Sequence, residues 1–153
     1  MSSLRTALLI AGALAAILTA CAPDETTTGT APPLPPELVG TWLFHSATLN
    51  GSPISMADLL QFAPGSDTAD VAVSANGTYV YTERDTNLVT TYTNAGTVTV
   101  SGNAITLTKT SENGVAQNPT IFLRGTYVLS GNQLTLTATI SGNVIVAVLL
   151  KKE

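Results

Sequence analysis

The sequence predicts an all-β protein: an antiparallel up-and-down meander closed into an eight- to ten-stranded barrel, with one short helix after the first strand. First, apolar and polar residues alternate with a period of two almost throughout the chain after Pro36. Second, short turn signals rich in glycine and asparagine separate the alternating segments. Third, an open meander of this size would leave two exposed edges, which closure into a barrel removes.

Composition limits the classes of function. The 153 residues are 44% hydrophobic and 10% charged, and six basic residues against ten acidic ones give a net charge of −4. The few cations are scattered, so we expect no nucleic-acid binding, which requires a clustered basic face. One histidine and one cysteine cannot build a zinc site from nitrogen and sulfur ligands, and we expect no cofactor.

Residues 1–20 have the three-part plan of a secretory signal peptide. Arg5 lies in a short polar start, an apolar run too short for a comfortable membrane span follows, and small residues lead into Cys21. The sequence Leu-Thr-Ala-Cys at 18–21 resembles the lipobox of bacterial lipoproteins. The resemblance implies that Cys21 is acylated, with chains such as palmitate, and becomes the mature N-terminus. A permanent anchor helix, or a signal peptide with an incidental cysteine, are the alternatives.

Residues 21–36 read as a lipidated cysteine followed by a tether. This stretch has five prolines, four threonines and no periodic apolar pattern. A binding motif for a proline-recognising partner is the alternative to a spacer. The resemblance to lipoproteins implies anchoring in the bacterial cell envelope, and Ala22-Pro23 after the cysteine favour the outer membrane, on its periplasmic or surface face. The acidic body should make no further contact with anionic lipid.

Residues 37–153 form the predicted barrel domain. Leu134 and Leu136, alternating with Thr135 and Thr137, illustrate strands with one apolar face and one face of threonine hydroxyls. The last strand is apolar on both faces, as expected if it closes against the first. The predicted strands lie near 38–48, 69–75, 78–84, 88–93, 96–101, 104–110, 119–129, 133–140 and 143–151.

One helix of about two turns is expected over residues 55–62. Ser55 and Asp58 have the spacing of a capping box, and Met56, Leu59 and Leu60 share an apolar face. Such a helix would either plug one end of the barrel or act as a lid over a cavity, and the sequence leaves both open.

Gly40-x-Trp42, at the start of the first strand of a meander, resembles the calycin group of lipocalins, fatty-acid-binding proteins and avidins. Together with "SANGTYVYT" and "GTYVLSGNQLTLT", it makes residues 37–153 similar to the small lipocalin-like domains of bacterial lipoproteins. The indole of Trp42 is then expected to plug one barrel end. Alternation sends Phe44 inward and His45 outward. In lipocalins an arginine of the last strand packs over the tryptophan; here Lys151 is the candidate substitute.

The resemblance implies that a monomeric, membrane-anchored protein binds a small hydrophobic molecule inside the barrel. The alternative is an envelope interaction or inhibitor protein with a solid barrel that uses its outer face or loops, such as residues 108–120. We do not expect an enzyme, because the single histidine points outward and no serine lies in a nucleophile-elbow motif. The expected lining residues, each of which could also be ordinary core, are Trp42, Phe44, Tyr79, Tyr81, Tyr92, Phe122 and Tyr127.

Overall fold

A computed structural model of the chain describes residues 33–60 and 65–153. The described residues belong to one compact unit, Ala31–Glu153. The predicted signal peptide, Cys21 and most of the tether therefore lie outside the described residues. Leu34, assigned to the tether, packs partly against the core, two residues before the expected end of the tether.

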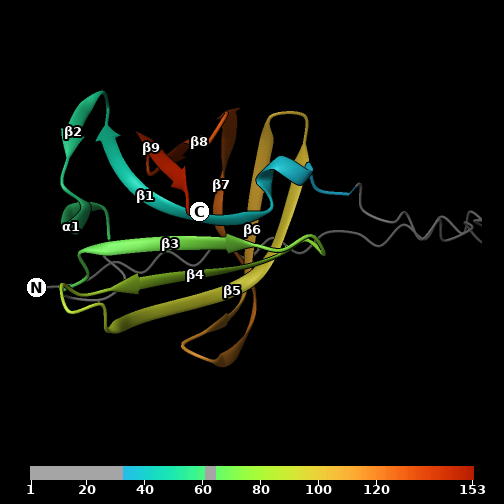
Figure 1. The fold of residues 1–153 in the computed structure, drawn as a ribbon, viewed down its shortest axis with the longest axis horizontal. Helices are drawn as coiled ribbons and strands as arrows, with labels where there is room; N and C mark the ends of the chain where they lie inside the picture. The colour runs from blue at the N-terminus through green and yellow to red at the C-terminus, as the bar shows by residue number, and fades with distance from the viewer. Residues whose placement is uncertain (1–32, 61–64) are drawn as a thin grey trace, which may run out of the picture. The chain divides into compact units, whose positions relative to one another are not determined.

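Nine antiparallel strands form one sheet, and eight of them close into a barrel (Figure 1). Each barrel strand pairs with the next in the chain, and β1 also pairs with β9, which closes the ring. The extra strand, β2, pairs only with β1. The predicted fold class is confirmed. The strands are β1 (Gly40–Leu49), β2 (Ser52–Ile54), β3 (Thr68–Val73), β4 (Thr78–Arg84), β5 (Thr90–Ser101), β6 (Ala104–Glu112), β7 (Val115–Ser130), β8 (Gln133–Ile140) and β9 (Asn143–Lys151).

Two-residue turns join most of the neighbouring strands. The turn signals rich in glycine and asparagine are confirmed as hairpin turns: the sequence Ser-Gly-Asn lies between β5 and β6, β7 and β8, and β8 and β9. The turn at Asn50-Gly51, with positive φ at both residues, creates the short strand β2, which the sequence analysis did not include.

The predicted division between strands at 88–93 and 96–101 is wrong, because β5 runs continuously from Thr90 to Ser101. Asn94-Ala95-Gly96 has the composition of a turn, yet here the register shifts against β6 between Ala95 and Gly96 while the strand continues. A Cβ at position 96 would overlap the Thr108 carbonyl. The glycine therefore permits a close approach of two strands and does not end one.

The predicted loop at 108–120 is also wrong, since these residues form the end of a long hairpin. β6 continues to Glu112, Asn113-Gly114 makes the turn, and β7 begins at Val115. Pro119 is tolerated inside β7 because the pairing with β6 is irregular there, between the Ser111–Ala116 and Lys109–Thr120 pairs. A partner approaching this region would meet a β-hairpin.

The predicted two-turn helix at 55–62 is shorter than expected: α1 spans only Met56–Leu59. The capping box is confirmed, because the Ser55 hydroxyl accepts a hydrogen bond from the Asp58 amide at 3.1 Å. The helix stops because Leu60 leaves helical geometry and turns its side chain into the core. A helix of a single turn is not stable by itself, so α1 is stabilised mainly by its packing against the rest of the protein.

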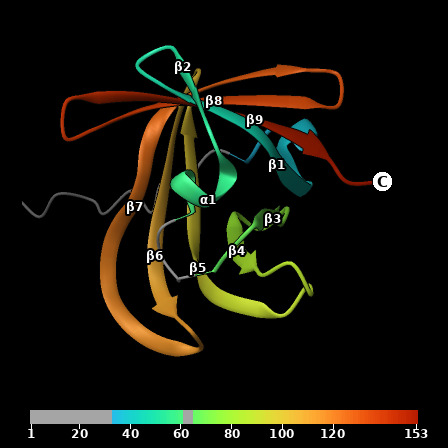
Figure 2. The same cartoon turned by 90° about the vertical axis from the view of Figure 1, so that its left-hand side faces the viewer.

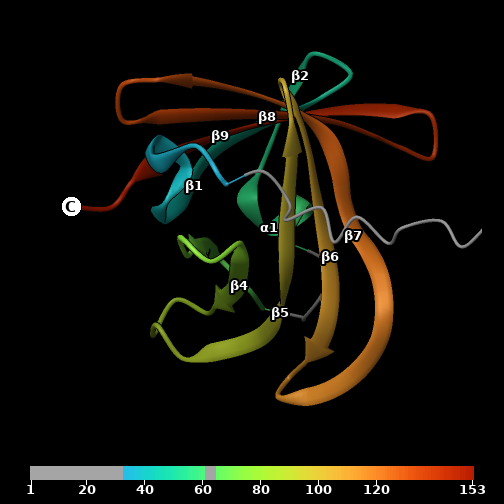
Figure 3. The same cartoon turned by 90° about the vertical axis from the view of Figure 1, so that its right-hand side faces the viewer.

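The two short helices lie at opposite ends of the barrel. Figure 2 looks into the ring of strands from the end where α1 crosses the opening. Figure 3 looks from the other end, where the 3₁₀ turn η1 (Pro36–Leu38) lies beside the start of β1. Leu38 of η1 and Leu60 after α1 are both buried, so each end contributes an apolar side chain to one core.

Candidate ligand cavity

A cavity of about 130 Å³ lies inside the barrel next to α1. Its walls come from β1, β4, β7, β8, β9 and the residues at the end of α1, and they are almost wholly carbon. Alternation along the strands explains the lining, because the inward face of each strand carries the apolar residues. The residues around the cavity are Phe44, Leu59, Leu60, Tyr81, Phe122, Leu123, Leu136, Ala138, Ile140, Ile145 and Ala147.

Three aromatic rings form one side of this cavity. The Tyr81 ring meets Phe44 edge-on at a centroid distance of 6.0 Å, and Phe122 lies 5.2 Å from Tyr81 in a tilted arrangement. Aromatic pairs at such separations fix one another's orientation. Phe44, Tyr81 and Phe122 are therefore the predicted lining residues that the fold brings together around the cavity.

The other four predicted residues do not line the cavity. Tyr79 is buried and stacks on Phe122 at 6.2 Å, and Tyr92 meets Tyr81 edge-on at 6.3 Å, so both support the cavity's aromatic side from behind. Tyr127 is partly buried against the core. Trp42 is fully buried near η1. Val80, between the two inward tyrosines of β4, is 47% exposed, as the predicted alternation requires.

The sequence analysis missed the aliphatic majority of the cavity lining. Ala138 and Ala147 are small residues on β8 and β9, and Leu60 reaches in from the end of α1. Small side chains on adjacent strands leave unfilled volume when no neighbour is large enough to occupy it. The inward alanines were visible in the sequence, but only the strand register shows that they face the same space as Leu60.

One wall of the barrel interior, on β4 and β5, is polar. The Tyr81 hydroxyl donates a hydrogen bond of 2.7 Å to Oε1 of Glu83, whose side chain is fully buried. Tyr81 lies opposite Asn94 on β5, and Glu83 lies opposite Tyr92. Among the residues that the structure describes, four buried side-chain atoms have no hydrogen-bond partner: Glu83 Oε2, Tyr79 Oη, Asn94 Oδ1 and Asn94 Nδ2.

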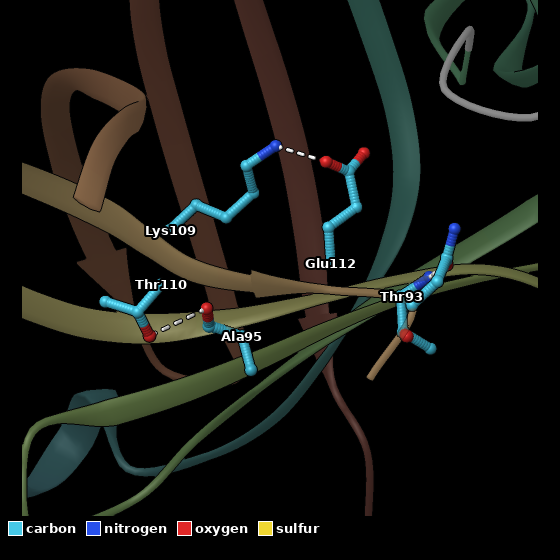
Figure 4. Close-up of polar contacts among 6 residues, drawn as sticks. Thr93, Ala95, Lys109, Thr110 and Glu112 are labelled. Atoms are coloured by element: carbon cyan, nitrogen blue, oxygen red, sulfur yellow. Dashed lines mark hydrogen bonds and ion pairs between the residues drawn. The ribbon is translucent and has the colours of Figure 1, made fainter. Parts of the chain in front are cut away.

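An ion pair on β6 continues this polar wall. Figure 4 shows the Lys109 ammonium donating to the Glu112 carboxylate, with Nζ and Oε2 2.8 Å apart. The hydrogen bond raises the pKa of Lys109 and lowers the pKa of Glu112. Burial, with the nearby Glu112 carboxylate, raises the pKa of Tyr92. Thr110, between the two ionic residues, turns its hydroxyl toward the Ala95 carbonyl 3.4 Å away (Figure 4).

The tyrosines of β4 are held neutral by the same surroundings. Burial is the main cause that raises the pKa of Tyr79, and burial together with the bond to Glu83 raises the pKa of Tyr81. The aromatic side of the cavity therefore carries uncharged phenols at any physiological pH.

Trp42 closes the barrel end near η1, as the sequence predicted. Its Nε1 donates a hydrogen bond of 2.8 Å to the Leu38 carbonyl. Nζ of Lys151 lies 5.2 Å from the indole centroid and donates to the Glu37 carbonyl, so Lys151 packs over the tryptophan, as expected from the sequence. His45 is exposed, and a bulge between Phe44 and Ser46 turns both His45 and Ser46 outward.

Within residues 33–60 and 65–153, no three histidine, cysteine, aspartate or glutamate side chains are grouped closely enough to hold a metal ion. In the same ranges no helix has the length and apolar character needed to cross a membrane.

Comparisons with known proteins give fold likenesses only. No protein-family model matches the chain, and no curated protein sequence is similar to it. Solved structures with a similar fold include a redesigned β-barrel, with 16% identity over 76% of this chain and 93% of the other, at a TM-score of 0.45.

Two natural proteins have similar values. Fatty-acid-binding protein 1 of Echinococcus granulosus has 12% identity and a TM-score of 0.42, over 76% of this chain and 98% of the other. The fluorescent protein UnaG has 15% identity and a TM-score of 0.41, with the same coverage. Because these similarities are low, the function proposed below rests on the geometry of this chain.

Proposed function

We propose that this protein binds a small, largely apolar molecule in the barrel cavity. The observation that carries the proposal is the apolar cavity itself, about 130 Å³ in volume, bounded by three aromatic rings and the aliphatic side chains of β8, β9 and α1. A barrel of eight strands can be filled completely by its own side chains, so an unfilled apolar space is a feature that needs a reason.

The volume limits the ligand. Typical small-molecule pockets span roughly 300–1,000 Å³, whereas an apolar cavity of about 150 Å³ binds a molecule the size of benzene. The cavity of about 130 Å³ therefore suits one ring or a short branched chain. A longer molecule would extend past α1, since Leu59 and Leu60 form that side of the wall.

Titration of the purified protein with toluene, followed by amide and methyl chemical shifts, tests the proposal. We expect saturable shifts at Ala138, Phe122 and Ile145. An Ala138→Leu substitution fills the cavity and should abolish them, whereas Thr139→Leu, at the neighbouring exposed position, should leave them intact. Binding that survives Ala138→Leu, or toluene shifts confined to the outer face, would contradict the proposal.

We further propose that the binding domain is held at a membrane of the bacterial cell envelope through lipidated Cys21. The support is the lipobox-like sequence at 18–21, since Cys21 lies outside the described residues. Cys21→Ala should abolish metabolic labelling with palmitate and leave an uncleaved or mislocalised precursor. Normal processing and localisation of this variant would refute the lipoprotein proposal without touching the cavity.

We propose that the protein is a binding protein and not an enzyme; its single histidine, His45, is exposed on the outside of the barrel.

The outer face offers a second candidate function. The rival function is contact with another envelope protein, and the observation that favours it is the exposure of three apolar residues along β7: Val115, Ile121 and Val128. Retained function in the Ala138→Leu variant would favour that rival.

A further inference from the structure

We propose that the ligand carries an uncharged hydrogen-bond donor, such as a hydroxyl group, which the buried carboxylate of Glu83 recognises, and that ligands ending in a carboxylate are rejected. This inference rests on the proposed function and specifies the ligand's polar end. It comes from the polar wall beside the apolar cavity, defined by Tyr81 and Glu83 of β4 and Asn94 of β5.

Tyr81 connects the two environments. Its ring lines the cavity, and its hydroxyl donates to Glu83 Oε1 at 2.7 Å. The Glu83 carboxyl group therefore lies one hydrogen bond beyond the cavity wall. Its side chain has no exposed surface, and Oε2 has no partner among the described residues. A buried acceptor without a partner costs free energy, so a donor that reaches it gains more than an ordinary hydrogen bond.

Asn94 adds a second unsatisfied group on the same wall. It lies directly opposite Tyr81 on β5, it is 1% exposed, and neither of its amide atoms makes a hydrogen bond of good geometry in the described part of the chain. The amide does lie close enough to the Tyr92 hydroxyl to act against the rise of the Tyr92 pKa. Side chains directly opposite on antiparallel strands have Cβ atoms about 5 Å apart. A ligand hydroxyl can donate to Glu83 and accept from the Asn94 amide at the same time.

A carboxylate ligand would fit this wall badly. An ionised carboxylate offers only acceptors, and it would place them against the unpaired oxygen of Glu83. The neighbouring cation, Lys109, is already paired with Glu112 at 2.8 Å and so is not free to compensate. Even with the Asn94 amide donating to one of its oxygens, a ligand carboxylate would set its charge against the Glu83 carboxyl group inside the barrel.

Three probes of nearly equal size test the inference by NMR titration of the purified protein: toluene, benzyl alcohol and benzoate. We expect benzyl alcohol to bind at least about tenfold more tightly than benzoate. Intermolecular NOEs should place the CH₂OH group next to Tyr81 and Glu83.

The decisive variant is Glu83→Gln. It keeps the acceptor that Tyr81 uses and replaces the unpartnered oxygen with an NH₂ donor, so the preference for benzyl alcohol over benzoate should fall to about threefold or less. Glu37→Gln, the same substitution at an exposed position, should leave the preference unchanged. Toluene binding should be the same in both variants, which also shows that they are folded.

The outcomes separate the two proposals. An unchanged preference in Glu83→Gln, or NOEs that place the CH₂OH group against Ala138 and Ile145, would overturn the role of Glu83 while cavity binding stands. Tighter binding of benzoate than of benzyl alcohol by the unmodified protein would do the same. Failure of all three probes to bind would refute the proposed function and this inference with it.

Discussion

At the scale of single residues, the end of the barrel near η1 is held by a small group of contacts around one indole. Trp42 donates to the Leu38 carbonyl, and the Lys151 ammonium lies over its ring while donating to the Glu37 carbonyl. Gly40 is required by its own backbone, whose φ of +138° is rarely adopted by residues with a Cβ, and the missing Cβ leaves room for the end of the Lys151 side chain. Lys151 thus joins the last strand to the first through packing as well as charge.

Lys151→Ala should lower the free energy of unfolding by about 1 kcal/mol, through loss of the cation–π contact and the covering methylenes. The matched control is Lys152→Ala, an exposed lysine whose backbone amide, not its side chain, bonds Thr41. Urea unfolding followed by Trp42 fluorescence measures both. An equal decrease in the free energy of unfolding in the two variants would show that Lys151 stabilises the protein only through its positive charge and not through contact with Trp42.

At the scale of elements, α1 is a wall of the cavity and not only a plug for the barrel end. Its single turn is stabilised by the Ser55 cap, and Leu59 and Leu60 contact the cavity. The sequence left two roles open for this helix: a fixed plug, which stays in place during binding, and a lid, which moves. α1 lies across this end of the ring of strands (Figure 2), and as a lid it would move aside when a ligand enters there.

Ser55→Ala should therefore speed ligand exchange several-fold with little change in affinity. Loss of an N-cap costs about 1 kcal/mol locally, which raises the population of open α1 by about fivefold to tenfold. Toluene exchange rates from NMR line shapes provide the measurement, and Ser52→Ala in β2, which removes a hydroxyl outside the cap, is the control. Identical exchange rates in the two variants would mean that ligands enter elsewhere.

At the scale of the whole molecule, the barrel interior is apolar around the cavity, and its polar groups are confined to β4–β6, where they lie among further core residues. Alternation and turn signals were enough to predict the barrel, its closure by β9 and the inward direction of Trp42 and Phe44. They were not enough at Gly96 and Pro119, because glycine and proline mark turns in sequence but here serve a close strand approach and a pairing irregularity.

The candidate site was predictable only in part, for a similar reason. Aromatic residues stand out in a sequence of 5% aromatics, so Phe44, Tyr81 and Phe122 were found. In the sequence, Glu83 is followed by Arg84 and Asp85, and this charged run predicts a solvated hairpin end, which is wrong for Glu83 because its side chain is buried. Parity along β4 places Glu83 with Tyr81 on the inward face, and only the three-dimensional register shows that this face is closed to water.

The buried tyrosines make stability depend on alkaline pH. The pKa values of Tyr79, Tyr81 and Tyr92 are raised in the folded protein, so their stabilising contribution is complete below the unfolded value of about 10. Above about pH 10 the unfolded chain releases these protons while the folded chain keeps them, and stability falls as pH rises, by up to about 1.4 kcal/mol per unit for each fully affected tyrosine.

Urea midpoints between about pH 8 and 12 provide the measurement, because this range brackets the ordinary tyrosine pKa. Tyr79→Phe should show a shallower decline and no loss of stability at neutral pH, because its buried hydroxyl has no partner among the described residues. A flat profile above pH 10 in the unmodified protein would contradict the burial of these phenols.

The central claim, an apolar cavity open to a ligand inside the barrel, is tested most directly by a crystal structure of the protein under xenon pressure. Xenon occupies dry apolar cavities of this size without needing any polar contact. We predict one strong xenon site bounded by Phe44, Phe122 and Ala147, with α1 in place. A barrel whose side chains close over this space, leaving no xenon there, would contradict the claim.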